Sequence, residues 1–151
     1  TIDTHPRTFL VVAKRDADAV NNRSVLGNRS SANGRIMRIR DDALVYGRIS
    51  NITNVYSYTT PGTPVVWTVT DVTANNGAVQ RANGTQNPTT HTPTNYFPSS
   101  LGMRVGAAGT SVVENFDGDI FSVFVWAGLH SQPQIRRIEQ SMAFSFRIPI
   151  Q

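Results

Sequence analysis

Apolar and polar residues alternate with a period of two along most of the chain, which is typical of half-buried β-strands. The clearest case is Val65–Val72, where β-branched residues and Trp67 alternate with threonines. Shorter apolar runs at Phe9–Ala13 and Ser24–Gly27 predict two earlier strands. The first half of the chain therefore predicts mainly β-structure, with a loop at residues 50–62.

Turn-forming dipeptides separate several further strand patterns. Asn33-Gly34 is a hairpin-type turn signal. The segment 85–100 carries three prolines and no periodicity, and it predicts a long connection. The stretch Phe116–Trp126 is apolar on both faces, so we expect it at the centre of a sheet, with a sheet below it and a helix or loop above. The other predicted strands are Arg35–Arg40, with Ile36 and either Met37 or Ile39 buried, Ala43–Ile49, Val55–Tyr58, Ala78–Arg81 and Leu101–Val105.

The C-terminal region predicts one helix and then a last strand. Ser131 suits an N-cap, Pro133 suits a first turn, and the helix should end near Ala143. Its apolar face would hold Gln134, Ile135, Ile138 and Met142. Alternation over Phe144–Ile150 predicts a strand whose apolar face holds Phe144, Phe146, Ile148 and Ile150. Many short strands with one late helix predict an all-β, two-sheet antiparallel sandwich.

Composition narrows the classes of protein. A chain of 151 residues suits one domain with its own hydrophobic core. Because it contains no cysteine, disulfides, zinc-finger spacings and a thiol nucleophile are excluded. Only 16% of residues are charged, which argues against disorder and against a long charged helix.

The net charge of +4 raises the question of nucleic acid. Lys14 is the single lysine among 14 basic residues, and the arginines are scattered along the chain. The tightest group, at 35, 38 and 40, is followed at once by Asp41 and Asp42. We therefore expect solvated strand faces and Arg–Asp pairs rather than a nucleic-acid site. The chain also has no run of 18 apolar residues, so it predicts no membrane span.

The acidic residues do not form a hydrolase pattern. Glycoside hydrolysis needs two carboxyl groups about 5–9.5 Å apart. The only glutamates, Glu114 and Glu139, lie in no carboxylate cluster, and Asp117 and Asp119 suit a solvent-facing strand entrance. There is no G-x-S-x-G elbow, H-E-x-x-H or P-loop. We predict a protein that is not an enzyme.

Several motifs resemble the concanavalin A-like jelly roll, specifically laminin-G-like lectin domains. Asn115–Trp126 is similar to the family strand F-x-G-x-I-x-x-v-x-v-w, and Gly128–Ile135 to the L-s-x-x-q-i helix start. Phe9–Ala13 is similar to an earlier "ftvfavv" strand. The resemblance implies a single domain over residues 1–151. Family members usually have one or two strands before the "ftvfavv" strand, so the first strand is missing here or is supplied by upstream sequence or another chain.

The resemblance, together with a cysteine-free composition rich in Asn, Thr and Ser, implies an adhesion or recognition module. Such modules occur in bacteriophage tail and head fibres and in bacterial surface proteins, so we expect an extracellular or virion-surface location. Two hypotheses remain open: a domain that binds host glycan, and a structural virion protein, such as a capsid decoration or fibre assembly module, with no small ligand. The expected partners are a cell-surface glycan or other virion or surface chains, in a homo-oligomer or larger assembly.

Two sets of candidate site residues follow. Glycan binding uses aromatic faces and polar side chains, and the loop residues that offer both are Tyr56, Tyr58, His91, Asn95, Tyr96 and Phe97. Trp67 and Trp126 lie in strands, and we interpret both as core residues. The resemblance also allows calcium, held by oxygen ligands, with candidates Asp71, Asn75, Asp117 and Asp119. The alternative is that these acidic and amide residues only form turns. No other cofactor is expected.

Overall fold

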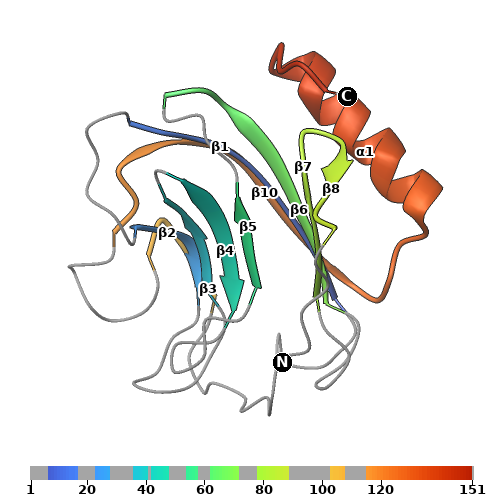
Figure 1. The fold of residues 1–151 in the computed structure, drawn as a ribbon, viewed down its shortest axis with the longest axis horizontal. Helices are drawn as coiled ribbons and strands as arrows, with labels where there is room; N and C mark the ends of the chain where they lie inside the picture. Colours follow the sequence, from blue (N-terminus) through green and yellow to red (C-terminus); the bar gives the residue numbers. More distant parts are fainter. Residues whose placement is uncertain are drawn as a thin grey trace.

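The computed structural model describes residues 7–16, 23–27, 36–40, 42–47, 54–57, 62–71, 78–88, 103–107 and 115–150 (Figure 1). Strands predominate among them, and one helix lies near the C-terminus, as the sequence predicts. The elements are β1 (Arg7–Arg15), β2 (Arg23–Gly27), β3 (Ile36–Ile39), β4 (Ala43–Gly47), β5 (Asn54–Ser57), β6 (Val65–Asp71), β7 (Ala78–Ala82), β8 (Thr85–Gln86), β9 (Arg104–Val105), β10 (Gly118–Ala127) and α1 (Gln132–Ser145). β8 lies within the segment that the sequence predicted as a connection.

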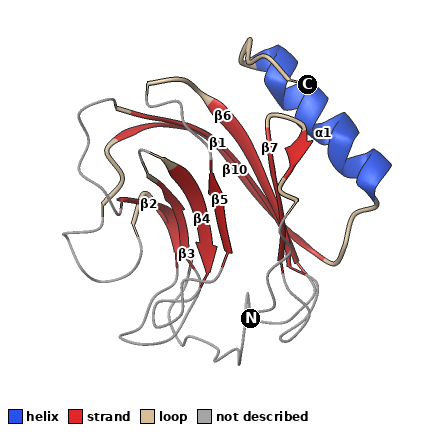
Figure 2. Ribbon diagram, viewed as in Figure 1, coloured by secondary structure: helices blue, strands red, loops and turns tan. Residues whose placement is uncertain are grey.

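The strands form two five-stranded sheets that face each other (Figure 2). Sheet A has the order β10-β1-β6-β7-β8, and sheet B has the order β5-β4-β3-β2-β9. Neighbouring strands in both sheets are antiparallel. Helix α1 lies on the side of sheet A that faces away from sheet B (Figure 2). Among the described residues, no helix is long and apolar enough to cross a membrane.

The inner core fills the space between the two sheets. Alternate residues of β1, namely Phe9, Val11 and Ala13, belong to this core and are fully buried. Trp67 of β6 is also buried, and its indole N–H donates to Oε1 of Gln80 at 2.8 Å. This bond satisfies the one polar atom of a ring that burial removes from water. The interpretation of Trp67 as a core residue is therefore confirmed.

The outer core lies between sheet A and α1. Leu10, Val12 and Val66 point away from the inner core and cluster with Ala143 and Ile148. Both faces of β1 are thus covered, which explains why the Phe9–Ala13 run is apolar without interruption.

Helix α1 begins as the sequence predicts. Ser131 is the N-cap, and its backbone N–H and hydroxyl both donate to Oε1 of Gln134, at 2.8 and 2.9 Å. The buried residues of the helix are Ile135, Glu139 and Ala143, spaced four apart along one face. A glutamate therefore lies in the middle of the buried stripe.

The predicted last strand, Phe144–Ile150, is wrong. The helix continues to Ser145, and the chain then closes it with a Schellman motif. The N–H of Ile148 donates to the carbonyl of Ala143 at 2.8 Å, and the N–H of Arg147 to the carbonyl of Phe144 at 3.2 Å. The motif directs the chain so that Ile148 packs in the outer core, and it leaves Phe144 88% exposed. The alternation of apolar residues therefore arises from a helix end and not from a strand.

Arg147 occupies the left-handed position of this motif, with φ of 55°. Glycine is favoured there because a Cβ makes this backbone conformation unfavourable by about 1–2 kcal/mol. Since glycine also loses more backbone entropy on folding, we expect Arg147→Gly to raise the free energy of unfolding by about 0.5–1 kcal/mol. Urea denaturation followed by circular dichroism measures this change. A loss of stability would show that the Arg147 side chain contributes more than its backbone strain costs.

The prediction that the Phe116–Trp126 strand is central in its sheet is also wrong. β10 is an edge strand that pairs, within the described residues, with β1 alone. Its two apolar faces have another cause: Ile120 and Val123 pack against the inner core, and Trp126 packs against the outer core. The layers above and below the sheet cover this strand, whereas the described residues provide no second neighbouring strand for it.

Candidate functional site

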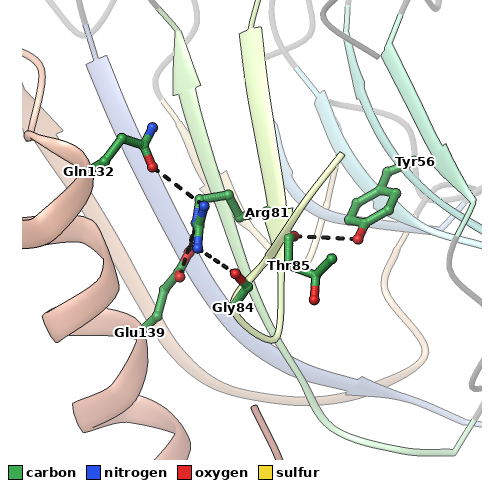
Figure 3. Close-up of polar contacts among 6 residues, drawn as sticks. All are labelled: Tyr56, Arg81, Gly84, Thr85, Gln132 and Glu139. Carbon is green, nitrogen blue, oxygen red and sulfur yellow. Dashed lines mark hydrogen bonds and ion pairs between the residues drawn. The ribbon is translucent and has the colours of Figure 1, made fainter. Parts of the chain in front are cut away.

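Tyr56 is the one predicted glycan-contact residue that the structure describes. Its half-buried ring packs against the inner core, and its hydroxyl donates to the carbonyl oxygen of Thr85 at 3.4 Å (Figure 3). Nearby, Nδ2 of Asn87 donates to the carbonyl oxygen of Val55 at 3.4 Å. These two bonds join the β5 edge of sheet B to the region around β8 in sheet A. Outside the described residues lie Tyr58, His91, Asn95, Tyr96 and Phe97, so a glycan site at this rim stays a prediction.

The predicted calcium ligands do not gather into a metal site where the structure describes them. Asp117 and Asp119 flank Gly118 at the start of β10, and both are exposed. The carbonyl oxygen of Asp117 accepts the N–H of Asp16 at 3.1 Å. In the described part of the chain, no three His, Cys, Asp or Glu residues are grouped so that they could hold a metal ion. The side chain of Asp71 and all of Asn75 lie outside it, and calcium binding remains a prediction.

A buried ion pair connects α1 to sheet A (Figure 3). Nε of Arg81, in β7, lies 3.1 Å from each carboxylate oxygen of Glu139, and both side chains are almost fully buried. The same guanidinium donates through Nη1 to Oε1 of Gln132 at 3.4 Å and through Nη2 to the carbonyl oxygen of Gly84. One arginine thus binds the first residue of the helix, its middle, and the turn after β7.

This network uses the one glutamate that lies in a described element. A pocket of about 310 Å³ lies beside the ion pair, lined by Arg81, Gly84, Arg136, Glu139, Gln140 and Ile150. Glu139 is the single carboxylate in that lining, and it is bound to Arg81. The two separated carboxyl groups that glycoside hydrolysis requires are not both present there. We assign the pair the role of positioning the helix. The sequence does contain a signal for it, because Glu139 lies one helical turn from both Ile135 and Ala143.

A group of rings, which we call the aromatic face, lies on the outer side of β10 and consists of Phe121, Phe124, Trp126, His130 and Phe146. The rings of Phe124 and Trp126 are stacked, with centroids 5.4 Å apart and planes 6° from parallel. Trp126 also contacts His130 at 5.1 Å, and Phe121 contacts Phe146 at 5.4 Å. Phe121 is 41% exposed and Phe124 is 37% exposed, so the stacked pair reaches solvent.

A β-bulge brings Phe121 onto this face. In the β1–β10 ladder Val12 pairs with Ser122 and Ala13 pairs with Ile120, so Phe121 has no partner of its own. Strict alternation would send adjacent residues to opposite sides of the sheet, but a bulge re-aims one side chain. Phe121 can therefore reach Phe146 on the outer side, while Ile120 stays in the inner core.

Sequence reasoning missed the aromatic face for one reason. We interpreted Trp126 as a core residue and expected its strand to be central, which would have buried Phe121 and Phe124 as well. Trp126 does pack against the outer core. Because the strand lies at the edge of the sheet, the rings beside it are half exposed.

Comparisons with known proteins define the fold but give no sequence relative. No protein family model matches the chain, and no curated protein matches it. Among solved structures, the CBM40 domain of a *Ruminococcus gnavus* IT-sialidase, bound to α2,3-sialyllactose, matches with a TM-score of 0.66 at 16% identity, over 91% of this chain and 84% of that one. The chain has a concanavalin A-like jelly-roll fold.

Two further structures share this jelly roll. A mutant *Trypanosoma rangeli* sialidase that displays trans-sialidase activity matches with a TM-score of 0.66 at 9% identity, over 97% of this chain but only 24% of the sialidase. A native heptameric SAP-like pentraxin from *Limulus polyphemus* matches with a TM-score of 0.62 at 14% identity, over 89% of this chain and 69% of the pentraxin. The similarity to the sialidase is therefore confined to about a quarter of that protein, and identities this low establish the fold alone.

Proposed function

We propose that this chain is a non-catalytic recognition module that binds a cell-surface glycan on its aromatic face, in an extracellular or virion-surface setting. The observation that carries the proposal is the stacked, solvent-reaching pair Phe124–Trp126. The jelly-roll likeness to a carbohydrate-binding module supports it. The engagement of Glu139 by Arg81 supports the absence of catalysis.

The physical basis is the shape and polarity of a sugar ring. A pyranose presents a flat patch of C–H groups on one face, and an aromatic ring with a negative π-face is its complement. Phe124 offers its ring on the solvent side of the stacked pair, Trp126 supports that ring from the other side, and His130 adds an imidazole next to Trp126. Such a surface suits a neutral sugar face, because no formally charged residue lies between Ile120 and Gln134.

We expect the chain to bind one or more glycans on an array, and Phe124→Ala to weaken that binding about tenfold, which corresponds to about 1.4 kcal/mol. Phe144→Ala is the matched control, because Phe144 is 88% exposed but lies outside the aromatic face. Isothermal titration calorimetry with the best glycan measures both variants.

Three outcomes would contradict parts of this proposal. An array with no bound glycan would remove the proposed function. Binding that Phe124→Ala leaves unchanged would move the site away from the aromatic face. Binding that Tyr56→Phe weakens would favour the predicted loop rim, since that change removes only the hydroxyl that donates to Thr85.

A structural assembly module is the second candidate function. The observation that favours it is the long apolar strand β10 at the edge of the described sheet A. A module of this kind would bind other protein chains through that edge and would need no small ligand.

A further inference from the structure

The four sheet edges in the described structure differ sharply in character. β8 and β9 have two residues each, and β5 is four residues long and tied to sheet A through Tyr56. β10 is ten residues long, and from Ile120 to Ala127 it contains no charged residue and no proline. Edge strands are normally short, charged or interrupted, because an open edge pairs with any suitable strand. Apart from its one bulge and Asp119 near its start, β10 as described lacks these protections.

Burial also stops abruptly at β10. Leu10 and Phe9 of β1 are each 1% exposed, whereas their ladder partners Phe124 and Val125 are 37% and 36% exposed. Both the inner and the outer core therefore extend to the edge strand and end there with apolar side chains half in water. A further strand along β10 would bury side chains on both faces at once.

We propose that a second copy of this chain supplies that strand, with β10 pairing antiparallel to β10 of the partner about a two-fold axis at Phe124. The segment Val123-Phe124-Val125 is its own complement in this register. Phe124 lies opposite its counterpart, and Val123 lies opposite Val125. Because opposite residues in an antiparallel ladder share a face, the valines meet on the inner side and the phenylalanines on the outer side.

The bulge restricts the axis to the regular stretch that begins at Ser122. Phe121 and Ser122 occupy one position of the β1 ladder, so the regular alternation of β10 begins at Ser122. An axis at Phe124 pairs Ser122 with Trp126 and uses only the regular stretch. An axis between Ser122 and Val123 would pair Ser122, which faces the outer side of the sheet, with Val123, which faces the inner side. Opposite residues in an antiparallel ladder share a face, so this pairing is excluded.

The charge distribution also permits a second copy. The chain carries a net charge of +4, which opposes self-association in general. The paired stretch is uncharged, and the nearest charge, Asp119, lies five residues from the axis. Because the bulge takes up one residue, the two copies of Asp119 would be eight ladder positions apart, about 26 Å, so they would not repel each other appreciably.

A single cysteine tests the register directly, because the chain has none of its own. In Phe124→Cys the two thiols would face each other across the axis, at the Cα separation of about 4.5–5.5 Å that a disulfide tolerates. We expect oxidation to give a covalent dimer that migrates at twice the mass on non-reducing gels. Phe144→Cys is the control, since Phe144 is more exposed but lies off the edge, and it should give little dimer.

Sedimentation velocity tests the association itself. We expect a wild-type monomer–dimer equilibrium that shifts toward the dimer as the protein concentration rises, because the proposed interface is small and therefore weak. We expect Phe124→Lys to be monomeric, because it sets two like charges opposite each other. Thermal melting of each variant checks that it remains folded. A wild-type monomer at the highest concentration, a dimer that survives Phe124→Lys, or equal crosslinking at positions 124 and 144 would overturn the proposal.

Discussion

Glu139→Ala should lower the free energy of unfolding by about 3–5 kcal/mol, the usual result of breaking a buried ion pair. The substitution leaves the Arg81 guanidinium charged and almost fully buried beneath α1. Gln132 and the Gly84 carbonyl remain as partners, but neither carries a neutralising charge. Urea denaturation at neutral pH, followed by circular dichroism, measures the loss.

Two comparisons show whether the loss of unfolding free energy comes from breaking the ion pair or from any substitution of a charged residue. The partly exposed pair Arg40–Asp42, at 3.7 Å, is the comparison, and Asp42→Ala should change stability by less than about 1 kcal/mol because the Asp42 side chain is 68% exposed. The double variant Arg81→Met with Glu139→Leu should recover most of the loss, because an apolar pair of similar volume needs no charge compensation. If Glu139→Ala cost no more than Asp42→Ala, the helix would not depend on this pair.

Gly118→Ala should destabilise the protein strongly. A Cβ at Gly118 would lie 2.2 Å from the carbonyl oxygen of Lys14 and 2.9 Å from Cα of Arg15, both of which are backbone atoms. The backbone φ of 141° is also one that only glycine adopts readily. Because β1 would have to move away from β10, we expect a loss of at least about 3 kcal/mol in the free energy of unfolding.

Gly128→Ala is the matched control for this prediction. Gly128 follows β10 with φ of 97°, but a Cβ there meets no atom within 4 Å. Its substitution should cost only the backbone strain, about 1–2 kcal/mol. Equal losses at both positions would mean that strain alone, and not the contact with β1, makes Gly118 necessary.

The sequence predicted the strands well because each one alternates or is continuously apolar between turn signals. Val65–Val72, for example, corresponds to β6, and the Asn83-Gly84 turn follows β7 with both residues at positive φ. These signals depend only on residues that are close in the sequence, so the elements they predict agree with the folded structure. The family resemblance, carried by motifs such as Asn115–Trp126, then predicted the jelly-roll arrangement correctly.

The errors concern features that depend on distant partners. The alternation of Phe144 to Ile150 could not reveal that Ile148 folds back onto Ala143 at a helix end. A strand that is apolar on both faces can lie at the centre of a sheet, or it can lie at the edge with a layer packed on each face. The sequence of β10 does not distinguish these two cases, so the exposed rings of the aromatic face were missed. Glu139 looked like an isolated helix residue because its partner, Arg81, lies 58 residues earlier.

The place of β1 also has a consequence for how the protein reaches its native state. This strand lies between β6 and β10, and Thr8 donates from its hydroxyl to the carbonyl oxygen of Gly128, 120 residues away. During synthesis β1 therefore leaves the ribosome long before β10 exists. The apolar side chains of β1 that contact β10 stay exposed to solvent until β10 has been synthesised. Contacts of such high sequence separation slow folding and lengthen the time in which a nascent chain can aggregate. We expect refolding in the range of milliseconds to seconds that is usual for all-β sandwiches, which stopped-flow fluorescence measures.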